Sequence, residues 1–250
     1  MDFLLKSVDG GIATLVFNRP KVNAINEALT DEMIATLRSL IEDPQVKAIV
    51  LTGQEKFFSF GLDIPEFIEY SKDSFTDFCT RFAELYTIIF LCPKPVVAAL
   101  NGHTVAGGCM IAIACDYRIM VSGKARIGLN EINFGSALFP GSTVMLAHCV
   151  GSRNAELIAY SGAMYSAEEA KNLSLIDEIA SGDDLLVRAT RVAGELAQKY
   201  APAFQAIKML LRKSAGEEMR RLDELHRDGN VDIWYSEHTW KQLQNIRIHT

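Results

Sequence analysis

Two segments contain glycines at positions where backbone N–H groups would be left accessible and without a hydrogen-bond partner. In SFGLDI, Gly61 permits a turn that exposes the N–H of Leu62. In AGGC, Gly107 and Gly108 precede an apolar segment and leave the first N–H groups of a helix unpaired. Two such N–H groups that converge on one point would form an oxyanion hole, which stabilises a developing negative charge.

A third segment, GLNE, supplies a carboxylate. Glu131 lies in mostly apolar sequence, and residues 132–155 contain no Asp or Glu. Burial of a lone carboxylate raises its pKa, so a buried Glu131 would be suited to proton transfer. Asp116, at the end of an apolar run, is better interpreted as a buried structural hydrogen-bonding residue. His103, among hydrophobic neighbours, indicates neither a metal site nor a catalytic triad.

Each segment also has a simpler interpretation. Glycine turns are common, the Gly107-Gly108 pair would equally allow close helix packing, and Glu131 would equally serve as a surface or ion-pairing residue. The sequence has no Gly-x-Ser-x-Gly elbow, no Walker loop, no dinucleotide glycine pattern and no metal-ligand cluster. No metal site is therefore expected.

The composition indicates a globular protein with one substantial core, since 49% of the 250 residues are hydrophobic and 22% are charged. The net charge of −6 argues against a general attraction to nucleic acid or to anionic membranes.

The five cysteines lack C-x-x-C spacing, and four lie in apolar surroundings, so buried free thiols in a reducing cytoplasm are expected. The segment MDFLLKSVDGG is too short and too polar for a signal peptide. Polar residues interrupt the apolar stretch 88–121, which indicates a core segment and no membrane span.

The elements that must position these segments alternate between strands and helices. The patterns predict strands at 2–8, 12–18, 47–53, 95–100, 117–121 and 174–180, a loop at 57–64, and helices at 27–42, 66–90 and 107–115. Ser166 and Glu169 have the spacing of a capping box. Residues 183–244 are predicted to be helical, with breaks at Pro202 and near Gly229. This order favours one α/β domain with a helical C-terminal subdomain.

Taken in order, the segments resemble the crotonase superfamily, the enoyl-CoA hydratase/isomerase family. The resemblance runs over nearly the whole chain and is carried by FNRP followed by VNAI, KAIVLTG, FSFGLDI, NGHTVAGGC with ACDYRI, GLNE, and GAMYSAEEAKNLSLIDEI. It implies an α/β spiral of repeated β-β-α units with a C-terminal helical subdomain. Residues 1–182 would be the core with the acyl-CoA site, and residues 183–250 would be a helical oligomerisation region that forms a trimer or a dimer of trimers.

The resemblance also implies roles for individual residues. An acyl-CoA thioester would be the substrate, without a separate cofactor, and its carbonyl oxygen would lie between the N–H groups of Leu62 and Gly107, with Glu131 as the catalytic residue. The residues implied to contact substrate or CoA are Val22, Ala24, Phe60, Gly61, Asp63, Ile64, Gly108, Met110 and Asn130. Arg19 and Lys21 are candidate phosphate contacts, and Pro65 stands where many relatives carry a lysine.

One departure from the family pattern bears on the reaction. Hydratases of the family use two glutamates, and the position of the first, two residues after the glycine pair, is Met110 here. The sequence has only the second glutamate, Glu131. In this it resembles the Δ3,Δ2-enoyl-CoA isomerases, which work with a single glutamate. The alternatives are an enoyl-CoA hydratase or another crotonase-type enzyme that uses Glu131 alone, and a catalytically silent acyl-CoA-binding subunit.

The C-terminal region contains Trp234, Tyr235 and Trp240 close together. This is more aromatic surface than a free tail normally exposes. We therefore expect the region to pack against the core or against a neighbouring subunit.

Overall fold

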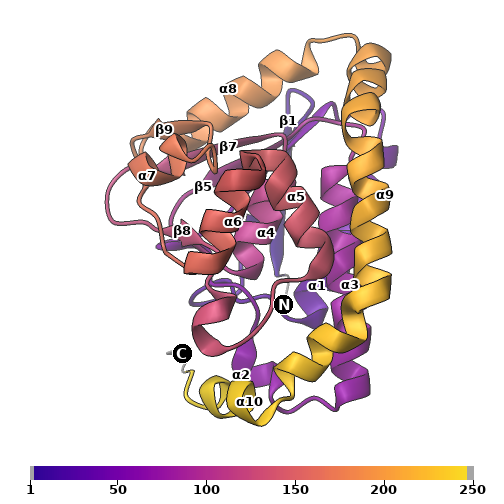
Figure 1. Cartoon of the computed structure of the whole chain (residues 1–250). Helices are drawn as coiled ribbons and strands as arrows, with labels where there is room; N and C mark the ends of the chain where they lie inside the picture. The colour runs from indigo at the N-terminus through magenta and orange to yellow at the C-terminus, as the bar shows by residue number, and fades with distance from the viewer. Residues whose placement is uncertain (1–2, 247–250) are drawn as a thin grey trace.

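In the computed structural model, which describes residues 3–246, the chain passes back and forth between two sheets (Figure 1). The larger sheet has the strand order β1-β2-β3-β5-β7-β9, in which β1 is antiparallel to β2 and the other pairs are parallel. Its strands are β1 (Leu4–Asp9), β2 (Ile12–Phe17), β3 (Ala48–Thr52), β5 (Val96–Leu100), β7 (Tyr117–Val121) and β9 (Glu178–Ala180). The smaller sheet is parallel and is formed by β4 (Phe57–Ser59), β6 (His103–Val105) and β8 (Ile127–Gly128).

The chain repeats one unit: a strand of the larger sheet, a strand of the smaller sheet, and then a helix. The units run β3-β4-α2-α3, β5-β6-α4 and β7-β8-η1-α5, so the expected β-β-α spiral is confirmed. The helices of this part are α1 (Glu27–Glu42), α2 (Ile64–Phe67), α3 (Lys72–Phe90), α4 (Gly107–Ala114), the 3₁₀ helix η1 (Glu131–Phe134), α5 (Pro140–Val150), α6 (Ser152–Ser161) and α7 (Ala167–Asn172).

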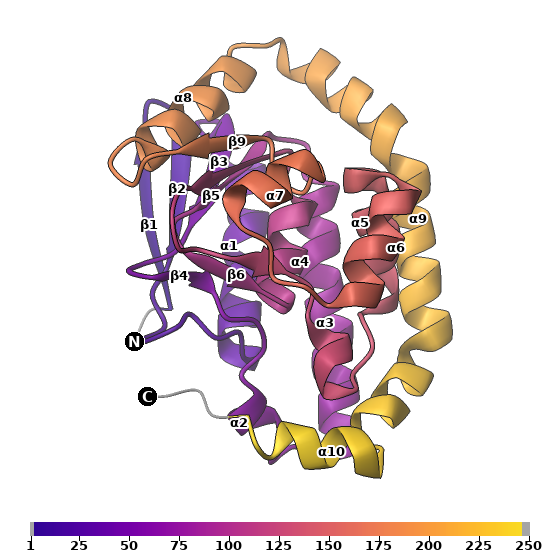
Figure 2. The same cartoon turned by 60° about the vertical axis from the view of Figure 1, so that its left-hand side comes forward.

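Both faces of the larger sheet are covered, which explains why its central strands are almost entirely apolar. On β3 alternate side chains point to opposite faces: Ile49 and Leu51 face the main core, and Ala48 and Val50 face a smaller cluster. Helix α8 (Leu185–Ala197) covers that smaller cluster, while α1, α3 and α4 lie on the other side of the sheet (Figure 2).

The C-terminal region wraps around the core of its own chain. Helix α9 (Ala201–Trp234) packs along α3 and α5, and α10 (Glu237–Leu243) lies beside α2 (Figures 1 and 2). The predicted break near Gly229 is wrong, because α9 continues to Trp234. A helical glycine costs only about 1 kcal/mol, and buried contacts of Met219 and Val231 hold the helix on both sides of it.

Other sequence expectations are refined by the structure. The segment 57–64 was expected to be a loop, but it contains β4, because Phe57 and Ser59 pair with β6. The helical segment 66–90 consists of α2 and α3 with a break between them, where Ser71 caps α3. The strand at 174–180 is only β9, because the N–H groups of Ser174 and Leu175 bond back to carbonyls of α7, at 3.0 and 2.8 Å, and do not join the sheet. Asp2 and residues 247–250 of the expected regions lie outside the described residues.

Several finer expectations hold. Helix α1 has the predicted bounds, and Ser166 and Glu169 form the capping box. Cys79, Cys92, Cys109 and Cys115 are buried free thiols, and Cys149 is half-buried. A search of the helices in the described part of the chain finds none with the length and apolar character needed to cross a membrane.

Candidate active site

Glu131 begins η1 and is buried, with 7% of its surface exposed. Its Oε2 atom has no hydrogen-bond partner among the described residues. Burial without a compensating cation raises the pKa of this carboxyl from 4.5 to about 8, although a backbone N–H partly opposes the shift. The sequence expectation of a buried carboxyl with a raised pKa is confirmed.

The loop around Leu62 leaves one backbone N–H unused. Residues 61–63 form a parallel bridge with Ile25, in which Ile25 donates to the Gly61 carbonyl and accepts from the Asp63 N–H, at 2.7 and 2.8 Å. The Leu62 N–H points away from this bridge and donates no hydrogen bond within residues 3–246. Gly61 has φ +94°, and a Cβ there would lie 3.2 Å from the Gly107 nitrogen. The turn therefore requires glycine and brings the Leu62 loop against Gly107.

Helix α4 supplies the second free N–H. Gly107 is its first residue, and the first hydrogen bond of the helix is made by Met110 to the Ala106 carbonyl. The Gly107 N–H is thus one of the unpaired donors of a helix N-terminus. A Cβ on Gly108 would lie 2.7 Å from the Ser59 carbonyl oxygen, so this glycine allows the helix to approach β4.

Ala106, just before the helix, has φ +50°, a conformation that a side chain normally disfavours. Its N–H donates to the Gly128 carbonyl at 2.9 Å, next to the β6–β8 pairing of Val105 with Gly128. This pairing ties the start of α4 to the segment that leads into Glu131. Backbone strain of this kind is typical of functional sites.

One cavity of about 290 Å³ brings these groups together. Leu62, Gly107 and Glu131 all line it, and Met110 forms part of its wall. Among the described residues that line the cavity, Glu131 is the only ionisable one. Two free N–H groups, one carboxyl and an otherwise uncharged wall can stabilise an enolate and move a proton.

The other candidate residues divide into two groups. Phe60, Ile64 and Asn130 line the cavity. The remaining candidates do not line it and lie behind its wall: Val22, Ala24, Gly61, Asp63 and Gly108. The Val22 carbonyl accepts from the Phe60 N–H at 3.0 Å, so this group supports the loop that carries Leu62.

Arg19, a candidate phosphate contact, is engaged in the protein itself. Its guanidinium pairs with Asp63 at 2.5 Å and with Glu66 at 3.3 Å, and it donates to the Ala24 carbonyl at 3.0 Å. These contacts link the segment of Ala24 to the Leu62 loop and satisfy most of the guanidinium. Lys21 is exposed. The structure thus assigns Arg19 a supporting role that the sequence did not suggest.

The structure adds wall residues that the sequence did not predict, several of them from distant segments. The aromatic rings of Phe75, Phe139 and Trp234 line the cavity, and Trp234 stacks on Phe75 at a centroid distance of 4.5 Å. The aromatic cluster in the C-terminal region was the only sequence signal for this. The expectation that the region packs against the core is confirmed by its contacts within the same chain.

The C-terminal helices also hold the segment that follows Glu131. Thr239 of α10 donates to the Gly135 carbonyl and Asn230 of α9 donates to the Leu138 carbonyl, each at 2.7 Å. Gly135 is the left-handed C-cap of η1. The position of Glu131 therefore depends on residues about 100 positions later in the chain.

Two further sequence interpretations can be compared with the structure. Asp116 is partly buried, with 13% of its side chain exposed, and accepts hydrogen bonds from the Val96 N–H and from Lys208, at 2.8 and 2.7 Å, as expected for a structural residue. The His103 ring lies against Phe57 at 5.3 Å. Within residues 3–246, no group of three His, Cys, Asp or Glu side chains is placed to hold a metal ion.

Comparisons with known proteins agree with this geometry. A family model described as enoyl-CoA hydratase/isomerase matches residues 7–241. The chain is 32% identical to 2,3-dehydroadipyl-CoA hydratase of Escherichia coli (strain K12), over 86% of this chain and 83% of that protein. It is 28% identical to the mitochondrial enoyl-CoA delta isomerase 1 of Rattus norvegicus, over 86% of this chain and 75% of that protein.

A solved structure extends the agreement to three dimensions. The crystal structure of human mitochondrial delta3-delta2-enoyl-CoA isomerase superposes with a TM-score of 0.93 at 25% identity, over 97% of this chain and 96% of that one. The chain therefore belongs to the enoyl-CoA hydratase/isomerase family of enzymes, the crotonase superfamily.

Proposed function

We propose that the protein is a Δ3,Δ2-enoyl-CoA isomerase that moves a double bond with a single-glutamate proton shuttle. The observation that carries this proposal is the cavity wall, in which Glu131 is the only ionisable side chain among the described lining residues. Met110 also lines this wall, at the position where the family resemblance implies the first glutamate of a hydratase. A thioether neither donates nor accepts a proton at useful strength. Proton transfer at the site thus depends on one carboxyl.

The reaction needs a base, an acid and a site for an oxyanion. Ionised Glu131 removes a proton from C2 of a 3-enoyl-CoA, and the electron pair of the broken C–H bond moves into the thioester carbonyl to give a dienolate. The N–H groups of Leu62 and Gly107 stabilise its oxygen, an effect worth several kcal/mol. Protonated Glu131 then returns the proton to C4, and the double bond moves from C3–C4 to C2–C3.

The raised pKa of Glu131 suits both halves of this cycle. A proton-transfer group works best when its pKa lies near the working pH, and burial brings this carboxyl to about 8. The same group is therefore a stronger base than an ordinary glutamate, and it remains a good enough acid to protonate carbon. An apolar wall that includes Met110 also limits the access of water.

Hydration is the alternative reaction. Water has to be oriented and deprotonated for attack at C3 while C2 receives a proton, and the described cavity wall offers one carboxyl for both tasks. The relatives include proteins named as hydratases as well as proteins named as isomerases. A catalytically silent acyl-CoA-binding subunit is the third candidate.

An acyl-CoA thioester is the proposed substrate, and no separate cofactor enters the proposed reaction. We also propose that the C-terminal helices mediate assembly into a trimer or a dimer of trimers, with the cytoplasm as the location. Apolar side chains on the outer face of α9 support assembly, since Ile207, Leu210 and Leu211 are more than half exposed. Light scattering at micromolar concentration tests it, and a monomeric mass would contradict it.

One assay panel separates the three functions. Purified protein is incubated with 3-enoyl-CoA, 2-enoyl-CoA and 3-hydroxyacyl-CoA of the same chain length, and the products are separated chromatographically. We expect 2-enoyl-CoA from the first substrate and little 3-hydroxyacyl-CoA from the second. Hydration as fast as isomerisation would favour the hydratase. Thermal stabilisation by a saturated acyl-CoA without any turnover would favour the silent subunit.

A further inference from the structure

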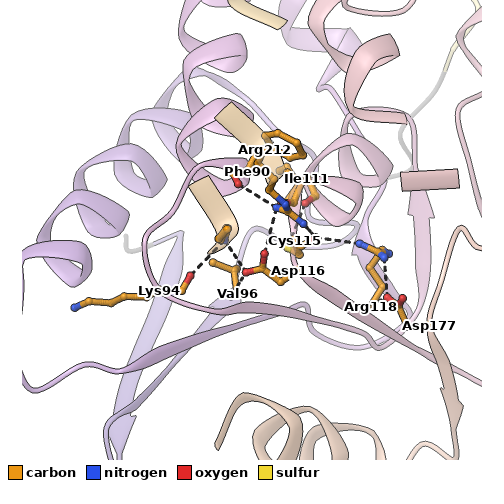
Figure 3. A network of polar contacts seen from close by, with 11 residues as sticks. Phe90, Lys94, Val96, Ile111, Cys115, Asp116, Arg118, Asp177 and Arg212 are labelled. Atoms are coloured by element: carbon orange, nitrogen blue, oxygen red, sulfur yellow. Dashed lines mark hydrogen bonds and ion pairs between the residues drawn. The ribbon is translucent and has the colours of Figure 1, made fainter. Parts of the chain in front are cut away.

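Helix α4, which carries the Gly107 N–H at its first residue, is held at its last residues by an arginine from α9. Arg212 donates to the carbonyl oxygens of Ala114 and Cys115 at 3.1 and 3.3 Å, where α4 ends (Figure 3). It also donates to the Phe90 carbonyl at the end of α3, at 3.0 Å. One guanidinium therefore joins the C-terminal ends of two helices.

Further contacts fix the orientation of this guanidinium. Arg212 pairs with Asp116 at 3.2 Å and lies 4.5 Å from the centre of the Phe90 ring. Asp116 in turn accepts from Lys208 at 2.7 Å, and the Lys208 side chain is only 4% exposed. A polar network whose members are hydrogen-bonded in this way rigidifies the segments that it joins.

A second arginine reinforces the same end of α4. Arg118 on β7 donates to the Cys115 carbonyl at 3.0 Å and pairs with Asp177 at 2.7 Å (Figure 3). Cations at the C-terminus of a helix also interact favourably with its dipole. The C-terminal end of α4 is thus anchored by directional, charged contacts.

The N-terminal end of α4 is held by fewer directional contacts: the Ala106 N–H donates to the Gly128 carbonyl at 2.9 Å, beside the pairing of β6 with β8. Ala106 makes no side-chain capping hydrogen bond, and all eight residues of the helix are buried and carry no charge. Packing of apolar side chains is not directional, so it constrains the position of the helix along its axis less well than hydrogen bonds do. The position of the Gly107 N–H along this axis therefore depends on both ends of the helix, and the charged contacts of Arg212 and Arg118 act at its C-terminal end.

We propose that Arg212 is a positioning residue for the oxyanion hole and acts on the Gly107 N–H through α4. The inference rests on the proposed role of this N–H in stabilising the oxyanion. Eight residues of α-helix span about 12 Å and move as a rigid body, so a shift at Cys115 is transmitted to Gly107. A misplacement of about 1 Å in an active site can cost roughly 100-fold in rate.

The first experiment compares Arg212→Met, Arg212→Lys and the control Arg221→Met. Arg221 is an exposed residue of the same helix that pairs with Glu218. We expect Arg212→Met to lower kcat roughly 10-fold to 100-fold with KM changed less than about threefold, because the oxyanion forms only after substrate binding. The kcat of Arg212→Lys should lie between those of the wild type and Arg212→Met, since a single ammonium cannot reach three carbonyls as the guanidinium fork does.

The second experiment measures polarisation of a bound thioester directly. The absorbance of 2,4-hexadienoyl-CoA moves to longer wavelength when hydrogen bonds polarise its carbonyl group. We expect a clear red shift with the wild type and with Arg221→Met, and a smaller one with Arg212→Met at saturating ligand. If Arg212→Met does not fold, Arg212→Lys provides the same comparison.

The outcomes separate this inference from the proposed function. A red shift that is equal in the wild type and in the folded Arg212 variants, or a KM effect without a kcat effect, overturns the positioning role and leaves the oxyanion hole intact. Absence of any shift in the wild type overturns the oxyanion hole itself. A lower melting temperature of the Arg212 variants, with kcat and the spectrum of the bound thioester unchanged, would show that Arg212 contributes to stability alone.

Discussion

Replacing Glu131 with glutamine should abolish isomerisation and make the protein more stable. The amide keeps the shape of the side chain and cannot transfer a proton, so turnover is lost while acyl-CoA binding is retained. The gain in stability follows from burial, because the glutamate is the group whose ionisation the folded state opposes. The two effects have one cause and should appear together.

The size of the gain follows from the pKa of the carboxyl. Its folded-state pKa of about 8 lies above the ordinary value of 4.5, so the folded protein binds more protons than the unfolded chain between these values. Stability therefore falls as pH rises through this window and is lowest above pH 8. With about 1.4 kcal/mol for each factor of ten in proton affinity, the penalty is about 3 kcal/mol at pH 7, about 5 above pH 8, and under about 1 at pH 5.

The assay is thermal or urea unfolding of the wild type and of Glu131→Gln at pH 5, 7 and 9. For a chain of this length, about 3 kcal/mol corresponds to a rise in Tm of roughly 6–12 °C. Glu195→Gln on α8 is the matched control, because Glu195 is exposed and a surface substitution of this kind changes stability by less than about 0.5 kcal/mol. Isomerisation by the wild type, measured as kcat/KM, should rise with pH up to about 8, because only ionised Glu131 accepts the C2 proton. A stability difference that is the same at all three pH values would refute the reasoning.

Four further substitutions test the cavity. Met110→Glu places a second carboxyl in the cavity wall and should produce measurable hydratase activity at a cost of roughly 1–3 kcal/mol in stability, read from 3-hydroxyacyl-CoA formation and from unfolding. Gly107→Pro removes one oxyanion N–H and should lower kcat roughly 100-fold, whereas Leu62→Ala should be mild; normal turnover by a folded proline variant would rule out the assignment. Trp234→Ala removes the ring that stacks on Phe75 in the cavity wall and should shift the preference toward longer acyl chains, measured as kcat/KM across a chain-length series.

Local signals in the sequence were sufficient to predict the parts of the site that depend on short segments. Gly61 and Gly107 predicted free N–H groups, and the structure shows why glycine is needed: a Cβ on Gly61 would meet Gly107, and one on Gly107 would lie 3.2 Å from the ring of Phe82. The lone carboxylate of Glu131 predicted a raised pKa, and burial produces it. The period of apolar residues in 27–42 predicted α1 with its observed bounds.

Features that depend on contacts between distant segments could not be predicted in the same way. The sequence around Gly229 favours a helix break, but packing on α3 and α5 keeps α9 continuous. Arg19 has the charge of a phosphate contact, yet Asp63 and Glu66 occupy its guanidinium. The aromatic cluster around Trp234 predicted packing of the C-terminal region, but it did not specify that the Trp234 ring reaches the same cavity as Leu62.

The presence of Met110 in place of an acid affects which groups influence the protonation of Glu131. A second carboxyl in the cavity wall would compete for the same proton, and the two groups would titrate as a pair. With a thioether in that wall, burial is the main influence on the proton of Glu131. Asn130 and Ser136, which also line the cavity, can hydrogen-bond a ligand but cannot exchange protons at neutral pH. A site of this composition can return the proton it has taken, which isomerisation requires, and its described lining residues include no second ionisable group with which to activate water.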